Sequence, residues 1–163
     1  MAGSLIYDAA DSGGTQALGH LLGSLVQPGM VVALVGPLGA GKTYLVRAIA
    51  EGLSIADSRS VCSPTFVLIQ EYDARLPIYH FDTYRLRNPE EFFDLGVQEY
   101  FEGNGICLVE WGDRVEHFLP PDHLQITIAV TGETSRRFTL TGTGGQAKTF
   151  VRALAAVISQ PEE

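Results

Sequence analysis

The fold is indicated by eight consecutive residues, Gly36-Pro37-Leu38-Gly39-Ala40-Gly41-Lys42-Thr43. They match the phosphate-loop pattern, in which two glycines five positions apart lead directly into a lysine and a hydroxyl residue. Small residues let successive backbone N–H groups curl around a triphosphate, and the following helix points its partly positive N-terminus at the same charge. We therefore expect Lys42 to contact the β- and γ-phosphates and Thr43 to give its hydroxyl to magnesium, which takes few protein ligands.

The residues on either side of this phosphate loop (residues 36–43) predict a strand before it and a helix after it, as the motif requires. Residues 30–35 are a short, valine-rich apolar run, typical of a strand buried on both faces. Apolar residues recur at helical spacing over residues 45–50, and we expect Gly52 to end this helix in a left-handed conformation. This context favours a nucleotide site over a glycine-rich turn with an incidental lysine.

Length and composition favour one compact α/β domain, residues 1–163. The longest apolar stretches are strand-sized, well below the ~20 residues of a membrane helix, and the sequence does not begin with a basic-then-apolar secretory signal. We therefore expect a cytoplasmic protein without membrane contact. Cys62 and Cys107 lack metal-ligand spacing, so we expect both to be reduced packing residues.

The formal charge of −8 bears on possible partners. A protein that grips nucleic acid by itself usually has a basic face, because neutralising phosphates supplies most of the non-specific binding energy. The only lysines are Lys42 and Lys148. We expect any RNA to be held mainly by a partner protein, although the arginines leave room for a local patch such as Arg85 with Arg87.

The rest of the sequence predicts a mixed α/β sheet, with parallel strands near the phosphate loop, added antiparallel strands, and helices on both faces. A helix is expected after the break at residues 11–14, with Ser12 or Thr15 near its start. Further helices are expected from Asn88-Pro89 onward and over residues 146–158. Strands are expected at residues 4–7, 66–72, 78–82, 106–110, 124–130 and 136–141, with the second and third, and the last two, forming hairpins.

Two predicted strands end in a carboxylate, as a phosphate-loop site requires for managing magnesium or the attacking water. Glu110 follows four apolar residues, and Asp82 ends the strand before it in the chain. A single strand-end acid is as readily explained by exposure to solvent, but the phosphate loop favours a metal role. We assign Glu110 to the magnesium shell, and Asp82 to that shell or to orienting water. We expect His80 to be a core histidine whose ring nitrogens have hydrogen-bond partners. Trp111 is expected to pack over the nucleotide, to form a docking surface or to lie at the edge of the core.

Thr65 lies between the loop helix and the next strand, where other phosphate-loop switch proteins place a γ-phosphate sensor. A proline-ordered turn explains the same residues equally well. Guanine-specific members of that class read the base through an Asn-Lys-x-Asp segment, and neither lysine of this chain stands in one. ATP is therefore favoured over GTP.

Four segments in this order resemble the TsaE family of bacterial ATPases, which serve tRNA threonylcarbamoyladenosine biosynthesis: residues 39–43, 63–66, 80–86 and 109–111. The resemblance spans nearly the whole chain. It implies an accessory ATPase with the cofactors ATP and Mg²⁺, working with TsaB and TsaD. Those partners transfer a threonylcarbamoyl group to the adenosine beside the anticodon, so tRNA would be reached through them.

The residue patterns and the resemblance together give the predicted residue roles. Catalysis falls to Lys42, Asp82 and Glu110, and magnesium binding to Thr43, Asp82 and Glu110. Nucleotide contacts are implied for Thr15, Gly39, Ala40, Gly41, Lys42, Thr43, Thr65, Asp82, Arg85 and Arg136. The chain departs from the family at Pro37, where aspartate is usual, and at Gly112, where proline usually follows the Glu-Trp pair. Proline lacks an N–H, so loop geometry and affinity are expected to differ.

The mechanism we expect is a conformational timer, in which ATP orders residues 63–66 and hydrolysis releases them. Such a protein should hydrolyse ATP poorly without its partners. The main alternative is a small-molecule or nucleoside kinase, which shares the loop and the carboxylates. Kinases of that kind commonly carry an arginine-bearing lid, whereas the region after Pro89 is acidic here. A third interpretation is a nucleotide-responsive binding module without useful hydrolysis.

Overall fold

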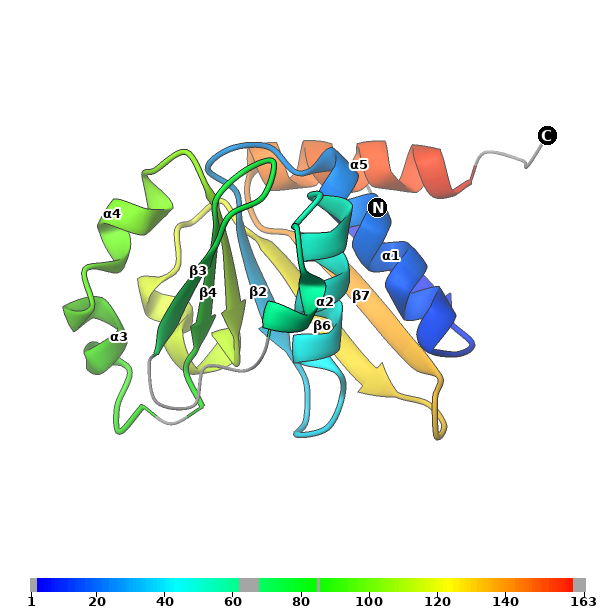
Figure 1. Cartoon of the computed structure of the whole chain (residues 1–163), viewed down its shortest axis with the longest axis horizontal. Helices are drawn as coiled ribbons and strands as arrows, with labels where there is room; N and C mark the ends of the chain where they lie inside the picture. The colour runs from blue at the N-terminus through cyan, green and yellow to red at the C-terminus, as the bar shows by residue number, and fades with distance from the viewer. Residues whose placement is uncertain (1–2, 62–67, 85, 160–163) are drawn as a thin grey trace.

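A computed structural model describes residues 3–61, 68–84 and 86–159 of the chain. Its centre is one seven-stranded sheet with the strand order β1-β7-β6-β2-β5-β4-β3 (Figure 1). The strands are β1 Ser4–Ala9, β2 Val31–Val35, β3 Ile69–Tyr72, β4 Ile78–Asp82, β5 Ile106–Glu110, β6 Leu124–Val130 and β7 Arg136–Gly142.

The sheet is mixed, as the sequence predicts. β2 lies between β5 and β6 and is parallel to both, and β4 is parallel to β5. β3 pairs antiparallel with β4, β7 with β6, and β1 with β7. Both predicted hairpins are therefore confirmed, and the carboxyl ends of β2, β4 and β5 lie at one edge of the sheet.

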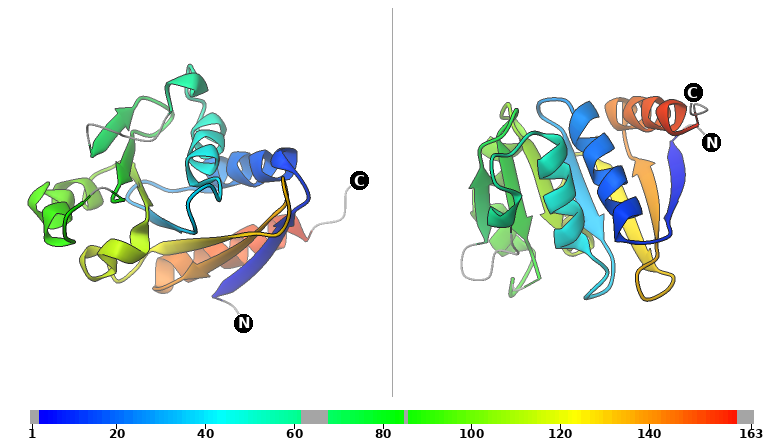
Figure 2. Two further views of the ribbon diagram at one scale, coloured as in Figure 1. Left: turned by 90° about the horizontal axis from the view of Figure 1, so that it is seen from below. Right: turned by 45° about the vertical axis from the view of Figure 1, so that its right-hand side comes forward.

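Helices pack on both faces. The α-helices are α1 Ser12–Leu25, α2 Lys42–Gly52, α3 Glu90–Asp94, α4 Val97–Phe101 and α5 Gly145–Ile158, and two 3₁₀ segments are η1 Ser58–Ser60 and η2 Gly112–Phe118. α1 and α2 lie side by side across the strands (Figures 1 and 2).

The alternating directions of the side chains along β2 explain how this strand contributes to the apolar clusters on both faces of the sheet. Val32 and Leu34 belong to the apolar cluster that includes α1, α2 and α5, whereas Val31 and Ala33 belong to the cluster that includes α3, α4 and η2. Successive side chains of a strand point to opposite faces, so a strand covered on both sides has to be apolar throughout. All four residues are buried.

The helix boundaries differ from the prediction at two points. Asp11, not Ser12 or Thr15, caps α1, and its side chain accepts a hydrogen bond of 3.0 Å from Gly14 N. The prediction that Gly52 ends α2 in a left-handed conformation is wrong, because Ser54 takes that conformation, with φ 64°. Gly52 instead meets α1, where a Cβ would lie 2.4 Å from His20 O.

No helix in the part of the chain that the structure describes is long and apolar enough to cross a membrane.

Candidate functional site

The phosphate loop joins the end of β2 to the start of α2. Gly39 and Gly41 have φ values of 81° and 102°, a left-handed conformation that residues with a Cβ rarely adopt. At Gly36 the constraint is space, because a Cβ would lie 2.9 Å from Ile128 O. Ala40 N donates to Pro37 O over 3.1 Å, so the loop closes on itself although proline stands at position 37.

Lys42 lies at the centre of this loop and is only 5% exposed. Its Nζ donates to Gly36 O at 2.7 Å and to Pro37 O at 2.9 Å. The same nitrogen lies 3.8 Å from the centroid of the Trp111 ring, within the range of a cation–π contact. Burial lowers the pKa of Lys42, and nearby carboxylates, first among them that of Glu110, act in the opposite direction.

Trp111 reaches Lys42 through an unusual backbone conformation. Its φ of 59° is left-handed, which for a bulky residue costs on the order of 1–3 kcal/mol. Thr83 Oγ1 donates to Trp111 O at 2.8 Å, and the Tyr84 ring lies 4.9 Å from the indole. After Trp111 the chain turns sharply into η2, where Gly112 has no room for a Cβ because Ala33 Cβ would lie 2.6 Å away.

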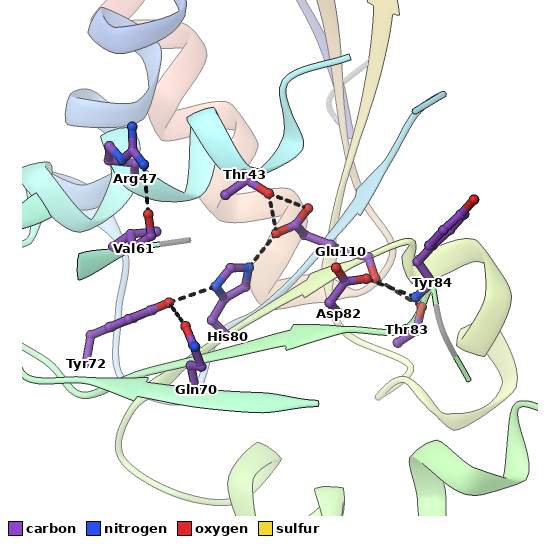
Figure 3. Close-up of polar contacts among 10 residues, drawn as sticks. All are labelled: Thr43, Arg47, Val61, Gln70, Tyr72, His80, Asp82, Thr83, Tyr84 and Glu110. Atoms are coloured by element: carbon purple, nitrogen blue, oxygen red, sulfur yellow. Dashed lines mark hydrogen bonds and ion pairs between the residues drawn. The ribbon is translucent and has the colours of Figure 1, made fainter. Parts of the chain in front are cut away.

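Thr43 and Glu110 meet beside the loop (Figure 3). Thr43 Oγ1 lies 2.9 Å from both carboxylate oxygens of Glu110, which is 3% exposed at the end of β5. The hydroxyl has one proton to donate, and giving it to Glu110 leaves its lone pairs for a cation. This pair has the chemistry of a magnesium site that the sequence predicts for both residues.

Asp82 lies next to Glu110, because the two residues are register partners at the ends of the parallel strands β4 and β5. Its Oδ1 accepts a 2.9 Å hydrogen bond from Tyr84 N. Among the described residues, no group of three or more His, Cys, Asp or Glu side chains is arranged to hold a metal ion.

His80 is fully buried on β4, with both ring nitrogens close to a polar partner. Its Nε2 lies 2.5 Å from Glu110 Oε2, and its Nδ1 lies 3.2 Å from the Tyr72 hydroxyl (Figure 3). The prediction of a satisfied core histidine is confirmed. The sequence did not predict that one partner would be Glu110.

A pocket of about 240 Å³ lies at the side of the phosphate loop, between the start of α1 and the β6–β7 turn. Arg136 Nε donates to Ala40 O over 2.9 Å and so ties the loop to β7. The pocket brings together Thr15 and Arg136, two residues implied by the family resemblance alone. Its lining residues are Ser12, Thr15, Ala40, Gly41, Tyr44, Glu133, Thr134 and Arg136.

Three of the predictions fall outside the described residues. They concern the sensor residue Thr65 with its segment 63–66, the nucleotide contact of Arg85, and the packing role of Cys62. Cys107 is a free, buried cysteine, as predicted.

Comparison with known proteins gives consistent matches. The family model described as "Threonylcarbamoyl adenosine biosynthesis protein TsaE" matches residues 9–138. A protein of Bacillus subtilis named "tRNA threonylcarbamoyladenosine biosynthesis protein TsaE" is 47% identical over 133 residues, which cover 81% of this chain and 82% of that protein. A Treponema pallidum protein of the same name is 43% identical over 126 residues, 77% of this chain and 92% of that protein. The crystal structure of Bacillus subtilis YdiB superposes with a TM-score of 0.81 and 36% identity, covering 96% of this chain and 97% of the other.

Proposed function

Because this chain belongs to the TsaE family and takes part in tRNA threonylcarbamoyladenosine biosynthesis, we propose that it binds and hydrolyses ATP at the phosphate loop. The observation that carries the proposal is the Thr43 hydroxyl donating to the buried Glu110 carboxylate, with the Lys42 ammonium in the adjoining loop. An ammonium, a hydroxyl and a carboxylate in this order are the groups that phosphate-loop enzymes use on a magnesium nucleotide.

The triphosphate would lie against residues 39–43, where Gly39 and Gly41 allow the loop to curve. The nucleoside would enter the adjoining pocket, in contact with Thr15 and Arg136. That pocket is formed partly by Ala40 and Gly41, so phosphates and nucleoside would share one continuous site. Thr65 belongs to the proposed nucleotide contacts as the candidate γ-phosphate sensor, and Arg85 belongs to them through the family resemblance.

Magnesium would be held by Thr43 and by Glu110, with Asp82 beside them as a further contact or as the residue that orients water. When bound, the cation supplies positive charge that offsets the charge developing on the phosphates. Lys42 would supply a second positive charge from the loop side. The short separation between Thr43 and Glu110 supports this arrangement.

Hydrolysis would act as a switch on a complex of TsaB and TsaD. ATP would favour one conformation of the segment around residues 63–66, and product formation would release it. Contact with tRNA would come through these partners, in line with the net charge of −8. A slow ATPase alone that is accelerated by TsaB and TsaD fits this role.

The first test compares Lys42→Ala and Glu110→Gln with Lys148→Ala, which removes the other lysine at an exposed position. Hydrogen bonds to charged groups contribute about 1.5–3 kcal/mol, so Lys42→Ala should weaken ATP binding roughly 10–150-fold. Glu110→Gln should leave the affinity for ATP in the absence of magnesium unchanged and abolish the release of inorganic phosphate by hydrolysis. Lys148→Ala should match the unchanged protein in calorimetry and in turnover. Unchanged affinity and turnover in Lys42→Ala would refute the proposal.

The second test isolates native complexes with and without ATP. Recovery of TsaB and TsaD homologues in one nucleotide state supports the switch, and their repeated absence in both states refutes it. A screen of small-molecule acceptors with labelled ATP separates this role from that of a kinase, because a kinase alone yields a phosphorylated product.

A further inference from the structure

A line of buried polar groups leads from the proposed magnesium site into the sheet. It begins at Glu110 on β5, continues through His80 on β4, and reaches Tyr72 on the edge strand β3 (Figure 3). Tyr72 in turn donates to Gln70 Oε1 at 2.5 Å. His80 has no exposed surface and Tyr72 has 9%, so each has to find its partners within the protein.

The carboxylate of Glu110 is an acceptor with two oxygens, and Thr43 Oγ1 lies equally far from both, at 2.9 Å. Thr43 therefore leaves the rotation of the carboxylate loosely defined. His80 Nε2 contacts one of these oxygens alone, Oε2, at 2.5 Å, and a contact on one side sets the plane in which the carboxylate lies.

The imidazole ring is fixed by its other nitrogen, which lies 3.2 Å from the Tyr72 hydroxyl. A hydrogen bond at one ring nitrogen selects the orientation in which the other nitrogen acts. Partners of this kind, one step removed from a metal, commonly tune metal affinity and activity.

We propose that His80, oriented by Tyr72, is a positioning residue that fixes the Glu110 carboxylate for magnesium and ATP turnover. This inference rests on the proposed function. It assigns His80 a role beyond core packing, because a histidine that merely filled the core would affect folding without affecting the response to magnesium.

The experiment measures ATP affinity with and without magnesium, together with turnover, in His80→Gln and Tyr72→Phe. Tyr72→Phe keeps the ring and removes the hydroxyl that orients His80. Tyr79→Phe is the matched control, since Tyr79 neighbours His80 on β4 but packs in the apolar cluster of the other face. Mutation of a residue that hydrogen-bonds to a metal ligand typically lowers metal affinity or activity about 10–100-fold. The His80→Gln protein should therefore turn over ATP more slowly by that factor and require more magnesium.

Tyr72→Phe should change turnover and magnesium requirement in the same direction by a smaller factor, and metal-free ATP affinity should stay within about twofold in both variants. If thermal melting shows that His80→Gln does not fold, Tyr72→Phe decides the question. In a Glu110→Gln background, neither change should reduce the magnesium-dependent gain in ATP affinity any further, because both act through Glu110.

Two results would overturn the inference while leaving the proposed function intact. One is an unchanged magnesium requirement in a folded Tyr72→Phe or His80→Gln protein whose turnover still depends on Glu110. The other is a loss of the magnesium-dependent gain in ATP affinity, caused by His80→Gln or Tyr72→Phe, that adds fully to the loss caused by Glu110→Gln. Failure of the unchanged protein to bind ATP at all would instead refute the proposed function.

Discussion

The contact between α1 and α2 depends on glycines, and Gly23→Ala tests how strictly. A Cβ at Gly23 would lie 2.3 Å from Ile49 O and 2.7 Å from Gly52 Cα, both atoms of the α2 backbone. Close carbon–oxygen contacts in proteins begin at about 3.3 Å, so the two helices would have to separate by roughly 1 Å. No side chain can rotate away to relieve the overlap, because the obstructing atoms belong to the backbone.

Overpacking a tight contact lowers the free energy of unfolding by about 1–3 kcal/mol, and we expect the upper end of this range because backbone atoms obstruct the new Cβ. The higher helix propensity of alanine offsets about 1 kcal/mol of this loss. We expect a net loss of about 1–2 kcal/mol in the free energy of unfolding, which lowers the melting temperature by roughly 2–8 °C for a chain of this size. Urea denaturation followed by circular dichroism measures the loss.

Gly145→Ala is the control, because Gly145 begins α5 and its added Cβ would meet no atom within 4 Å apart from its chain neighbours and the backbone of its own helix. Its stability should stay within about 0.5 kcal/mol of the unchanged protein. Gly23→Ala should also weaken ATP binding at temperatures where the protein is folded, since α1 carries Thr15 and α2 begins at Lys42. If the Gly23→Ala protein is as stable as the Gly145→Ala protein, the contact between α1 and α2 does not require glycine at position 23 and the reasoning is refuted.

Three further predictions concern single residues. Arg136→Ala should weaken ATP binding about tenfold, because it removes the hydrogen bond to the carbonyl of Ala40 in the phosphate loop. Arg137→Ala, at the exposed neighbouring position, should leave ATP affinity unchanged, and equal effects of the two changes would refute a specific contact of Arg136. Because burial lowers the pKa of Lys42, ATP affinity should begin to fall at a pH below the ordinary lysine pKa of about 10.4, with proton uptake on binding detectable by calorimetry in two buffers. Affinity that falls only above that ordinary pKa contradicts this. Burial raises the pKa of Cys107 to about 12, so in a Cys62→Ser protein a thiol reagent near pH 8 should label it only at the rate of unfolding; rapid labelling of the folded protein would contradict its burial.

Local signals in the sequence predicted the elements well. The valine-rich run before the phosphate loop became β2, and the two expected pairs of strands became the hairpins β3–β4 and β6–β7. Gly52 was misassigned because a glycine near the end of a helix has two explanations, a left-handed cap or a close neighbour. The neighbour is His20 of α1, more than 30 positions earlier, and no local pattern reports such a distant contact.

The same distinction holds at the site. Asp82 and Glu110 were predictable as acids at strand ends, and the parallel pairing of β4 with β5 made them neighbours. The contact of His80 with Glu110 depends on that same pairing, which periodicity alone does not specify. The contact of Trp111 with Lys42 depends on a left-handed turn at a bulky residue, a conformation that local propensity argues against.

The contacts of Lys42 explain how the phosphate loop keeps its curvature. Two carbonyls of its own loop and the Trp111 ring stabilise the ammonium, so the lysine side chain holds the loop curved. In the proposed complex, phosphate oxygens would replace neutral carbonyls as acceptors, which adds the attraction between opposite charges to hydrogen bonds that the ammonium already strengthens. The ammonium would exchange partners with little movement of the loop. Since the loop itself would then need little ordering, the entropic cost at the loop would be low, and the contribution of Lys42 to affinity would depend mainly on the difference between phosphate and carbonyl as its partners.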